Sequence, residues 1–462
     1  MNRYQVLTAA QMRAAEQRLF DQGLKVGDLM EAAAGAAAEW IRRLSGSGRV
    51  CVLCGPGNNG GDGYVIARRL REWDYSVQVI APLSPKSRAA SDALEAWGGP
   101  VLTSGGPAQG DVFVDCLFGS GLKRPLEAEH ALLLRDVADR YAFSVAVDVP
   151  SGIATDTGEL LNDKLPRFDV TLALGAWKFA HCASEARAHL GVQRLVPIGI
   201  GKVEGAARRL GKPKIASPAR NAHKYSRGLC AVVSGSMPGA AILSATSAMR
   251  SGAGYTKMLG PAFREAPASL VCDEALLDEA LSDKRIKALL VGPGLGRSEG
   301  ARAALSTCLR SSKPIVLDAD ALHLLKPTAL SSDTPTILTP HDAELNALCS
   351  NFSIIASGRR ERAQALANAS GSVVLAKGPD SYIAAPNGSL VIGPSASSWL
   401  SVAGTGDVLA GILVSRLATG VESFEAACEA LWIHTEAARL CGPAFTADDL
   451  AHRVGDALSA CL

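Results

Sequence analysis

Short apolar runs that end in a small or polar residue recur along the chain, and this repetition restricts the folds that it can adopt. Each run has the length of a buried strand, and a glycine-rich turn or a helical pattern usually follows. The runs lie at residues 50–54, 111–115, 144–148, 229–233, 288–291, 315–318, 336–339 and 373–377. Buried strands that alternate with helices predict an α/β protein with doubly wound parallel sheets, which bind ligands at the carboxyl ends of their strands.

The length of the chain and one irregular stretch predict two domains. The chain has 462 residues, and a domain commonly takes about 150. Residues 199–217 mix glycine, proline and basic residues without periodicity, as domain boundaries often do. We therefore expect one domain over residues 1–205 and a second over residues 206–462.

Composition argues against several classes of protein. The formal net charge of +2 is too small to indicate a nucleic-acid or membrane-surface partner. No apolar run is long enough to span a bilayer, and the first residues do not resemble a signal segment. The 11 cysteines are scattered, which favours reduced thiols and a cytoplasmic protein. Cys51 and Cys54 form a C-x-x-C pair, but on a strand they point to opposite faces, so we expect no zinc or redox site.

Residues that cap helices predict where two of the helices begin. Residues 8–44 have a helical pattern, and Thr8 with Gln11 fits a capping box at its start. Thr339 is expected to cap the helix that follows the run at 336–339, so that His341 projects between strand and helix. A purely structural role for His341 is the alternative.

A glycine-rich segment at residues 55–63 follows the first buried strand and precedes a helix expected from residue 64. Its glycines satisfy the G-x-G-x-x-G pattern of dinucleotide sites. The next strand, however, ends in Ala81-Pro82 without the acidic residue that binds a ribose hydroxyl, which argues against an ordinary hydride-transfer site. Asn58 and Asn59 offer amide oxygens that suit a monovalent cation or a ribose hydroxyl. The alternative is that both only tolerate a left-handed turn.

Polar residues at strand ends of the first half are expected to converge at one edge of the sheet. They are Asn59, Asp115, Asp148 and Ser151. An aspartate at a strand end is often only a cap, but agreement among three strand ends favours a site. The segment from Gly119 to Gly121, with Lys123 and Arg124, can cradle a phosphate, although it lacks the GK[ST] core of a Walker A loop.

In the second half, residues 404–411 combine a turn, one carboxylate and an apolar helix. Gly404 and Gly406 permit a close approach of the backbone to a ligand, and Asp407 falls in the first turn of the helix. Free N–H groups at a helix start attract anions, most often phosphate. Phosphate repels a carboxylate, so we interpret Asp407 as a base that takes a proton during reaction. The alternative is an aspartate that only stabilises the helix start.

Several motifs together resemble one family of fused enzymes. Residues 57–63, 114–121 and 147–152 resemble the NAD(P)H-hydrate epimerase domain. Residues 223–228, 292–296, 338–344 and 404–411 resemble the NAD(P)H-hydrate dehydratase domain. In this order they are similar to the family of bifunctional NAD(P)H-hydrate repair enzymes. The resemblance covers nearly the whole chain.

This resemblance implies both folds and activities. Residues 1–205 are expected to form a Rossmann-like three-layer αβα sandwich, and residues 206–462 a ribokinase-like α/β fold. The first half would interconvert the R and S hydrates of NADH and NADPH, called NADHX and NADPHX. The second would dehydrate the S hydrate with ADP or ATP and Mg²⁺, giving NAD(P)H, AMP from ADP, and phosphate.

The resemblance also implies the residues of the epimerase site. Asp148 is the expected proton shuttle, and K⁺ is expected between Asn59, Asp115 and Ser151. Ser120 stands where many epimerases have threonine, a change that keeps a hydroxyl group. The expected hydrate contacts are Asn58, Asn59, Gly60, Gly61, Asp62, Gly119, Ser120, Gly121, Leu122, Lys123, Arg124, Pro125 and Asp148.

For the dehydratase site, the resemblance implies that Asp407 takes the proton of the substrate hydroxyl as the phosphoryl group arrives. The expected hydrate contacts are Ala240, Ala241, Gly294, Gly296, His341 and Asp407. The expected nucleotide contacts are Lys377, Gly378, Pro379, Asp380, Ser381 and Gly406. The short helix entry at residues 236–240 leaves open which of the two alanines makes the contact.

Two other functions remain open on the sequence. The second half would be a ribokinase-like small-molecule kinase if a stable phosphorylated product were released, with the first half a non-catalytic nucleotide-binding domain. The whole chain would be a nucleotide-binding scaffold if neither half were catalytic, but Asp148 together with Asp407 argues against this. We further expect a homo-oligomer whose partners are small molecules rather than nucleic acid or membrane.

Overall fold

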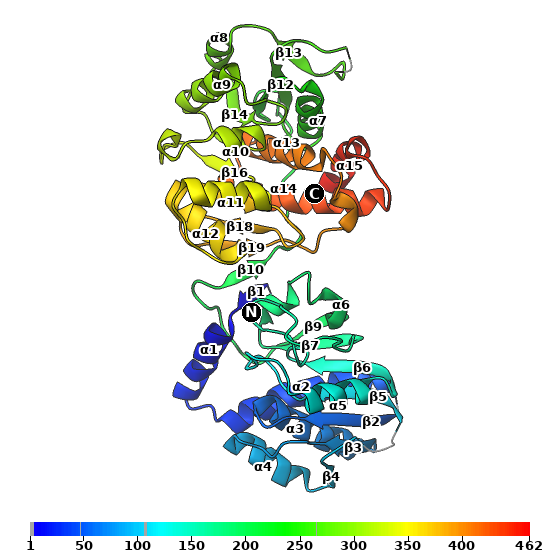
Figure 1. The fold of residues 1–462 in the computed structure, drawn as a ribbon. Helices are drawn as coiled ribbons and strands as arrows, with labels where there is room; N and C mark the ends of the chain where they lie inside the picture. Colours follow the sequence, from blue (N-terminus) through cyan, green and yellow to red (C-terminus); the bar gives the residue numbers. More distant parts are fainter. Residues whose placement is uncertain (1–3, 47, 106–108, 265) are drawn as a thin grey trace. The chain divides into compact units, whose positions relative to one another are not determined.

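The computed structural model describes residues 4–46, 48–105, 109–264 and 266–462. The chain divides into two compact units, Met1–Arg208 (unit 1) and Arg209–Leu462 (unit 2). In each unit, helices cover a mainly parallel sheet (Figure 1). This arrangement confirms the α/β fold class.

The sheet of unit 1 has seven parallel strands in the order β4-β3-β2-β5-β6-β7-β9. The strands are β2 (Arg49–Cys54), β3 (Ser76–Ile80), β4 (Val101–Leu102), β5 (Gly110–Cys116), β6 (Tyr141–Val147), β7 (Val170–Leu174) and β9 (Val192–Val196). Since the chain runs outward from β2 through β3 to β4, and outward on the other side from β5, the strand order reverses between β2 and β5. Ligands bind at such a reversal in open α/β sheets.

Helices cover both faces of this sheet. α2 (Val26–Ser45), α3 (Asn58–Glu72) and α4 (Arg88–Trp97) pack on one face, and α5 (Ala128–Ala138) packs on the other. Cys54 faces the first group and Cys51 faces α5, which confirms that the C-x-x-C pair points to opposite faces. The remaining elements of unit 1 are β1 (Gln5–Leu7), α1 (Ala9–Asp21), β8 (Trp177–Lys178), η1 (Phe179–His181) and α6 (Arg187–Leu190). The short strand β10 (Ala207–Arg209) includes the boundary between the units.

Residues 8–44 form two helices, so the prediction of one long helix was wrong. α1 ends at Asp21, and Gly23 has a φ of 98°, which a right-handed helix cannot include. The predicted capping box is present: the N–H of Gln11 donates to Oγ1 of Thr8 at 3.1 Å, and the N–H of Thr8 donates to Oε1 of Gln11 at 3.0 Å.

The glycine-rich segment after β2 is helical rather than a turn, because α3 begins at Asn58 instead of residue 64. Its glycines allow the helix to lie directly against the preceding strand. A Cβ on Gly60 would lie 1.8 Å from the carbonyl oxygen of Gly55, and one on Gly63 would lie 2.7 Å from Sγ of Cys54. Asn58 and Asn59 are therefore in right-handed helix, and the left-handed turn considered for them is absent.

The sheet of unit 2 is parallel from β13 to β17, in the order β13-β12-β11-β14-β15-β16-β17-β18-β19. β18 and β19 are antiparallel, so a hairpin rather than a helix follows Lys377. The strands are β11 (Leu229–Val233), β12 (Tyr255–Leu259), β13 (Val271–Asp273), β14 (Ile286–Val291), β15 (Ile315–Leu317), β16 (Thr336–Leu338), β17 (Val373–Ala376), β18 (Tyr382–Ala384) and β19 (Leu390–Ile392).

Two groups of helices cover the two faces of this sheet (Figure 1). One group shares a large apolar core with the strands: α7 (Pro238–Met249), α13 (Thr405–Ala418), α14 (Ser423–Cys441) and α15 (Ala447–Ser459). The other group comprises α8 (Leu277–Leu281), α9 (Glu299–Arg310), α10 (Asp320–Leu324), α11 (Asp342–Asn351) and α12 (Arg359–Ser370). Two short 3₁₀ turns are η2 (Pro327–Ala329) and η3 (Ser398–Leu400).

Helix α11 is capped by His341, not by Thr339 as predicted. Nδ1 of His341 accepts hydrogen bonds from the N–H groups of Ala343 at 3.1 Å and Glu344 at 3.3 Å. Thr339 is buried and instead donates from Oγ1 to Oδ1 of Asp318 at 2.7 Å. A buried hydroxyl group satisfies its hydrogen bond where a partner is available, and here that partner lies on the neighbouring strand end.

Gly411 lies where α13 crosses α7, and alanine at this position is expected to destabilise unit 2. A Cβ on Gly411 would lie 2.1 Å from the carbonyl oxygen of Ser244, a backbone atom that cannot move away cheaply. Overpacking of this kind costs about 1–3 kcal/mol. Gly455 of α15 is the matched control, since a Cβ there meets nothing within 4 Å. Its replacement by alanine should stabilise the helix by roughly 0.5–1 kcal/mol. Chemical denaturation of both variants measures the contrast, and equal effects would contradict it.

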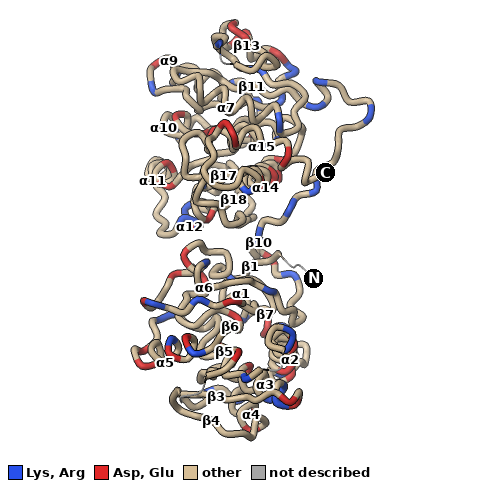
Figure 2. Tube along the Cα trace, turned by 90° about the vertical axis from the view of Figure 1, so that its right-hand side faces the viewer, with Lys and Arg blue, Asp and Glu red and all other residues tan. Residues whose placement is uncertain are grey.

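Charged residues of both signs are interspersed over both units (Figure 2). Several pair within or between neighbouring helices, such as Arg42 with Glu39 and Arg68 with Glu31. Among the residues that the structure describes, no helix combines the length and the hydrophobicity that a membrane crossing needs.

Candidate active sites

A cavity of about 510 Å³ lies at the carboxyl edge of the unit 1 sheet, where the strand order reverses between β2 and β5. Helices α1 and α2 contribute its other walls, among them Arg13 and Phe20 of α1. The predicted site residues that line it are Asn58, Asn59, Asp62, Gly119, Ser120, Gly121, Leu122 and Asp148.

The other residues predicted for this site do not line the cavity. They are Gly60, Gly61, Lys123, Arg124 and Pro125. Gly60 and Gly61 are buried behind it, where Gly60 packs on the backbone of Gly55 and a Cβ on Gly61 would lie 2.5 Å from Cε of Met30. Both positions therefore favour glycine because a side chain would clash with neighbouring atoms.

Asp148 follows β6 at the floor of the cavity and has the left-handed φ of 68°. Its Oδ2 accepts a hydrogen bond of 3.1 Å from the N–H of Ser120, and its Oδ1 pairs with Nζ of Lys178. Burial is the largest influence and disfavours the charged form of Asp148. The charge and hydrogen bond of Lys178, together with smaller contributions from His181 and Ser120, nevertheless hold the pKa of this carboxyl group below its ordinary value. Asp148 is thus an ionised base in contact with an acid.

Lys178 was not singled out in the sequence, although it ends an apolar run at residues 172–178. The run is split into β7 and β8, and Lys178 lines the cavity with a side chain that is 1% exposed. Two further carboxyl groups line the same cavity. Burial, followed by the charge of Asp148, raises the pKa of Asp62 well above its ordinary value, and burial also raises the pKa of Glu16.

Asp115 and Ser151 lie together beneath the segment that follows β5. Asp115 accepts hydrogen bonds from the N–H groups of Ser151 at 2.8 Å and Leu117 at 3.0 Å, and from Oγ of Ser151 at 2.8 Å. Burial raises the pKa of Asp115 to about 6, although these hydrogen bonds lower it. The donors that hydrogen-bond to this carboxylate are therefore all neutral.

Asn59 is close to this segment, since a Cβ on Gly119 would lie 3.1 Å from Oδ1 of Asn59. Nδ2 of Asn59 is buried without a hydrogen-bond partner. A site with neutral oxygens and only one carboxylate binds a monovalent hard cation in preference to Mg²⁺ or Ca²⁺. The residues that are present therefore fit K⁺.

In unit 2, Asp407 is the third residue of α13, and the helix is preceded by Gly404 with a φ of 91°. Burial, followed by the nearby charge of Asp318, raises the pKa of Asp407 to about 7. Lys377 lies beside the same helix start, because a Cβ on Gly406 would lie 3.4 Å from its Nζ. The site thus holds a carboxyl group that exchanges a proton near neutral pH, next to a cation and free helix N–H groups.

Three neighbouring strand ends of unit 2 meet at Asp318, which was not singled out in the sequence. Its Oδ1 accepts from Nζ of Lys377 at 2.6 Å and from Oγ1 of Thr339 at 2.7 Å. These residues follow β15, β17 and β16, and the carboxyl ends of adjacent parallel strands lie at one edge. The aspartate that ends the predicted run at 315–318 was the available signal.

Of the other residues predicted for the unit 2 site, Ala240 and Ala241 lie in the first turn of α7, and the rest lie on loops. Gly294 packs against the entry to α7, where its Cβ would lie 3.2 Å from Cβ of Ala240. Ala240 is partly exposed, whereas Ala241 is fully buried in the core. His341 is half exposed, and Gly378 and Ser381 hydrogen-bond to each other across the turn that contains Pro379 and Asp380.

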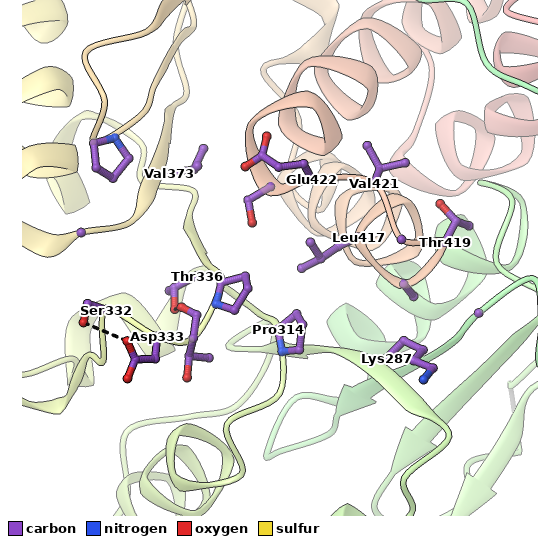
Figure 3. A pocket seen from close by; sticks show the side chains of 18 of the residues that line it. Lys287, Pro314, Ser332, Asp333, Thr336, Val373, Leu417, Thr419, Val421 and Glu422 are labelled. Carbon is purple, nitrogen blue, oxygen red and sulfur yellow. Dashed lines mark hydrogen bonds between the residues drawn. The ribbon is translucent and has the colours of Figure 1, made fainter.

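A larger hollow of about 630 Å³ lies in unit 2 at the amino ends of the strands (Figure 3). No predicted site residue lines it. Its charged side chains are Lys287, Asp333 and Glu422, and Glu422 already accepts hydrogen bonds from the start of α14. Its volume alone does not make it the site, because the convergent polar groups of unit 2 lie at the opposite end of the sheet.

Comparisons with known proteins match both units. A family model described as NAD(P)H-hydrate dehydratase matches residues 230–459, and one described as the YjeF-related protein N-terminus matches residues 26–180. The bifunctional NAD(P)H-hydrate repair enzyme of Gloeobacter violaceus is 35% identical, over 93% of this chain and 92% of its own length. The enzyme of the same name from Mycobacterium leprae is 32% identical, over 94% of this chain and 93% of its own.

A solved structure is also similar to unit 2. It is described as the ADP/ATP-dependent NAD(P)H-hydrate dehydratase from Bacillus subtilis co-crystallised with ATP and Mg²⁺. It is 26% identical with a TM-score of 0.48, and the alignment covers 54% of this chain and 95% of that chain.

Proposed function

The chain belongs to the family of bifunctional NAD(P)H-hydrate repair enzymes, and we propose that its two units divide the two activities. The protein interconverts the R and S hydrates of NADH and NADPH and dehydrates the S hydrate at the expense of ADP or ATP. The observation that carries this function is the relationship to such enzymes over 93% of the chain. We assign epimerisation to residues 1–205 and dehydration to residues 206–462. The kinase and scaffold alternatives have no such support.

In unit 2, Asp407 takes the proton of the ring hydroxyl group while the terminal phosphoryl group of the nucleotide moves to its oxygen. Phosphate then leaves with the electrons of the C–O bond, and loss of a proton from the adjacent carbon restores the double bond of the nicotinamide ring. The pKa of about 7 for Asp407 supports this role, because a base works best near the working pH. The N–H groups at the start of α13 stabilise the developing negative charge.

The same edge of unit 2 holds both substrates in this proposal. The hydrate contacts are Ala240, Gly294, Gly296, His341 and Asp407, with the exposure of Ala240 favouring it over Ala241. The nucleotide contacts are Lys377, Gly378, Pro379, Asp380, Ser381 and Gly406. Mg²⁺ would accompany the nucleotide, because it binds polyphosphate oxygens and neutralises their charge.

In unit 1, the cavity takes the nicotinamide hydrate against Asp148. The contacts are Asn58, Asn59, Asp62, Gly119, Ser120, Gly121, Leu122 and Asp148, and residues 123–125 would contact only a part of the substrate outside the cavity. Arg13 and Lys86 line the same cavity and supply positive charge for the phosphate groups of the substrate.

We further propose that Asn59, Asp115 and Ser151 hold K⁺, and expect epimerisation to be faster in potassium chloride than in tetramethylammonium chloride at equal ionic strength. A bound cation would keep Asp115 ionised and organise the segment that contacts the substrate. The unfolding temperature of the protein should also rise with potassium. The Asp115→Asn variant should lose most of both responses. Equal rates and equal unfolding temperatures in the two salts would refute the ion site.

A coupled assay tests the combined function. Purified protein is mixed with NADHX epimers and ADP, and the absorbance of reduced nicotinamide is followed. Both epimers should be consumed, with release of phosphate and no stable phosphorylated product. Accumulation of a phosphorylated hydrate would favour the kinase instead.

The cellular location and the oligomeric state of the enzyme are also proposed. A cytoplasmic location is supported by the absence of disulfides among the described cysteines, most of which are buried. We also propose a homo-oligomer. Light scattering of the purified protein gives its mass directly.

A further inference from the structure

Lys178 is the buried cation at the floor of the unit 1 cavity. Its side chain is 1% exposed, forms the ion pair with Asp148, and donates a 2.6 Å hydrogen bond to the carbonyl oxygen of Leu174. Removing an ammonium group from water costs several kcal/mol even when it is paired. Packing alone therefore does not favour lysine here, and both partners line a cavity that a ligand can enter.

The chemistry of the hydrate calls for an acid and a base together. Water adds to a ring double bond next to nitrogen with its oxygen on the carbon that is bonded to nitrogen. Such a carbon inverts when its C–N bond opens to an aldehyde and closes again on the other face. Opening removes the proton of the hydroxyl group and adds a proton to nitrogen. The hydroxyl oxygen and the nitrogen are bonded to the same carbon, so the acid and the base must lie close together.

We propose that Lys178 is the second catalytic residue of unit 1, the acid that complements Asp148. The proposal rests on the assignment of epimerisation to this unit. Asp148 takes the hydroxyl proton, the C–N bond breaks with its electron pair moving to nitrogen as the C=O bond forms, and Nζ of Lys178 gives nitrogen a proton.

The reverse steps complete the inversion. Rotation about the bond to the aldehyde carbon presents its other face to nitrogen. Nitrogen then attacks this carbon, its proton returns to Lys178, and the oxygen recovers its proton from Asp148. Nothing is oxidised or reduced, and no water is gained or lost.

His181 positions the two residues against each other. Its Nδ1 accepts a 2.8 Å hydrogen bond from the N–H of Lys178, so its Nε2 carries the proton and donates to the carbonyl oxygen of Asp148 at 2.7 Å. This bridge joins the end of β6 to the start of η1 and helps to hold Asp148 at its left-handed φ. The hydrogen bonds of His181 thus help to keep Lys178 and Asp148 in contact.

The test measures the conversion of pure R hydrate into S hydrate, with the epimers separated by chromatography. Nucleotide is left out so that dehydration does not take place. Lys178→Met is expected to slow this conversion by about 10²–10⁴, as for loss of a general acid. Lys178→Arg should be slowed as well, because guanidinium keeps the charge but does not give up a proton readily. Lys202→Met, which changes an exposed lysine of the same unit, should match the wild type.

Chemical rescue separates a catalytic role from a structural one. The Lys178→Gly variant should regain epimerisation when small primary amines are added, with rates that follow the acidity of the amine. Near wild-type rates for Lys178→Arg would overturn the proposal, as would a folded Lys178→Gly variant that amines do not rescue. Its unfolding temperature and its dehydration of the S hydrate report folding. A wild-type protein that does not epimerise would instead refute the assignment of unit 1.

Discussion

Replacing Asp407 by asparagine is expected to lower the dehydration rate by about 10²–10⁴, the usual cost of losing one general base. Asparagine has the same shape, so nucleotide binding should persist. Phosphate release from ADP and the S hydrate measures the loss, and calorimetric titration with nucleotide measures binding. Asp333→Asn is the matched control, since Asp333 is exposed in the same unit and lies at the amino ends of the strands.

The pH dependence of the wild type gives a second signature of Asp407. Its pKa of about 7 lies above its ordinary value of 3.8, so the group becomes protonated, and loses its function as a base, as the pH falls through 7. The dehydration rate should fall with it, and the residual rate of Asp407→Asn should not. Because the raised pKa also means that ionisation costs stability above pH 4, asparagine should raise the unfolding temperature at pH 8. Wild-type turnover by the variant would contradict the assignment.

The Asp148→Asn variant should lose epimerisation by about 10²–10⁴ while it dehydrates the S hydrate at the wild-type rate. Asparagine tolerates the left-handed φ of 68° at this position, so the backbone is kept and only the base is removed. The two rates are measured on one preparation, first from R hydrate without nucleotide and then from S hydrate with ADP. Asp163→Asn, at an exposed position of unit 1, serves as control. Equal losses of both activities would contradict separate sites.

The sequence predicted which strand ends carry converging polar groups better than how these groups are arranged. Strand ends and glycine-rich segments pointed to Asp148 and Asp407, because polar residues directly after apolar runs are visible without a structure. The role of Lys178 could not be predicted, since a lysine at the end of an apolar run also fits an exposed strand end. Its ion pair with Asp148 joins residues from different strands, and sequence spacing does not encode such contacts.

The errors in the predicted elements have related causes. Helix propensity did not reveal the break at Gly23, because Gln22 and Leu24 on either side of it favour helix. Glycines read as a turn in residues 58–63, whereas the close approach of α3 to β2 requires them within a helix. Thr339 was expected to cap α11, but its burial beside Asp318 gave it another partner. In the second and third cases a tertiary contact overrode a sound local preference.

The break between α1 and α2 has an evolutionary consequence. It allows Arg13 and Phe20 of α1 to line the cavity together with Val26 and Met30 of α2, while the proposed reacting groups Asp148 and Lys178 lie outside both helices. Substitutions on this helical pair can therefore change which ligand is accommodated without moving Asp148 or Lys178. Selection can adjust recognition and chemistry as separate traits in this unit, so that new substrates are reachable by mutating α1 and α2 alone.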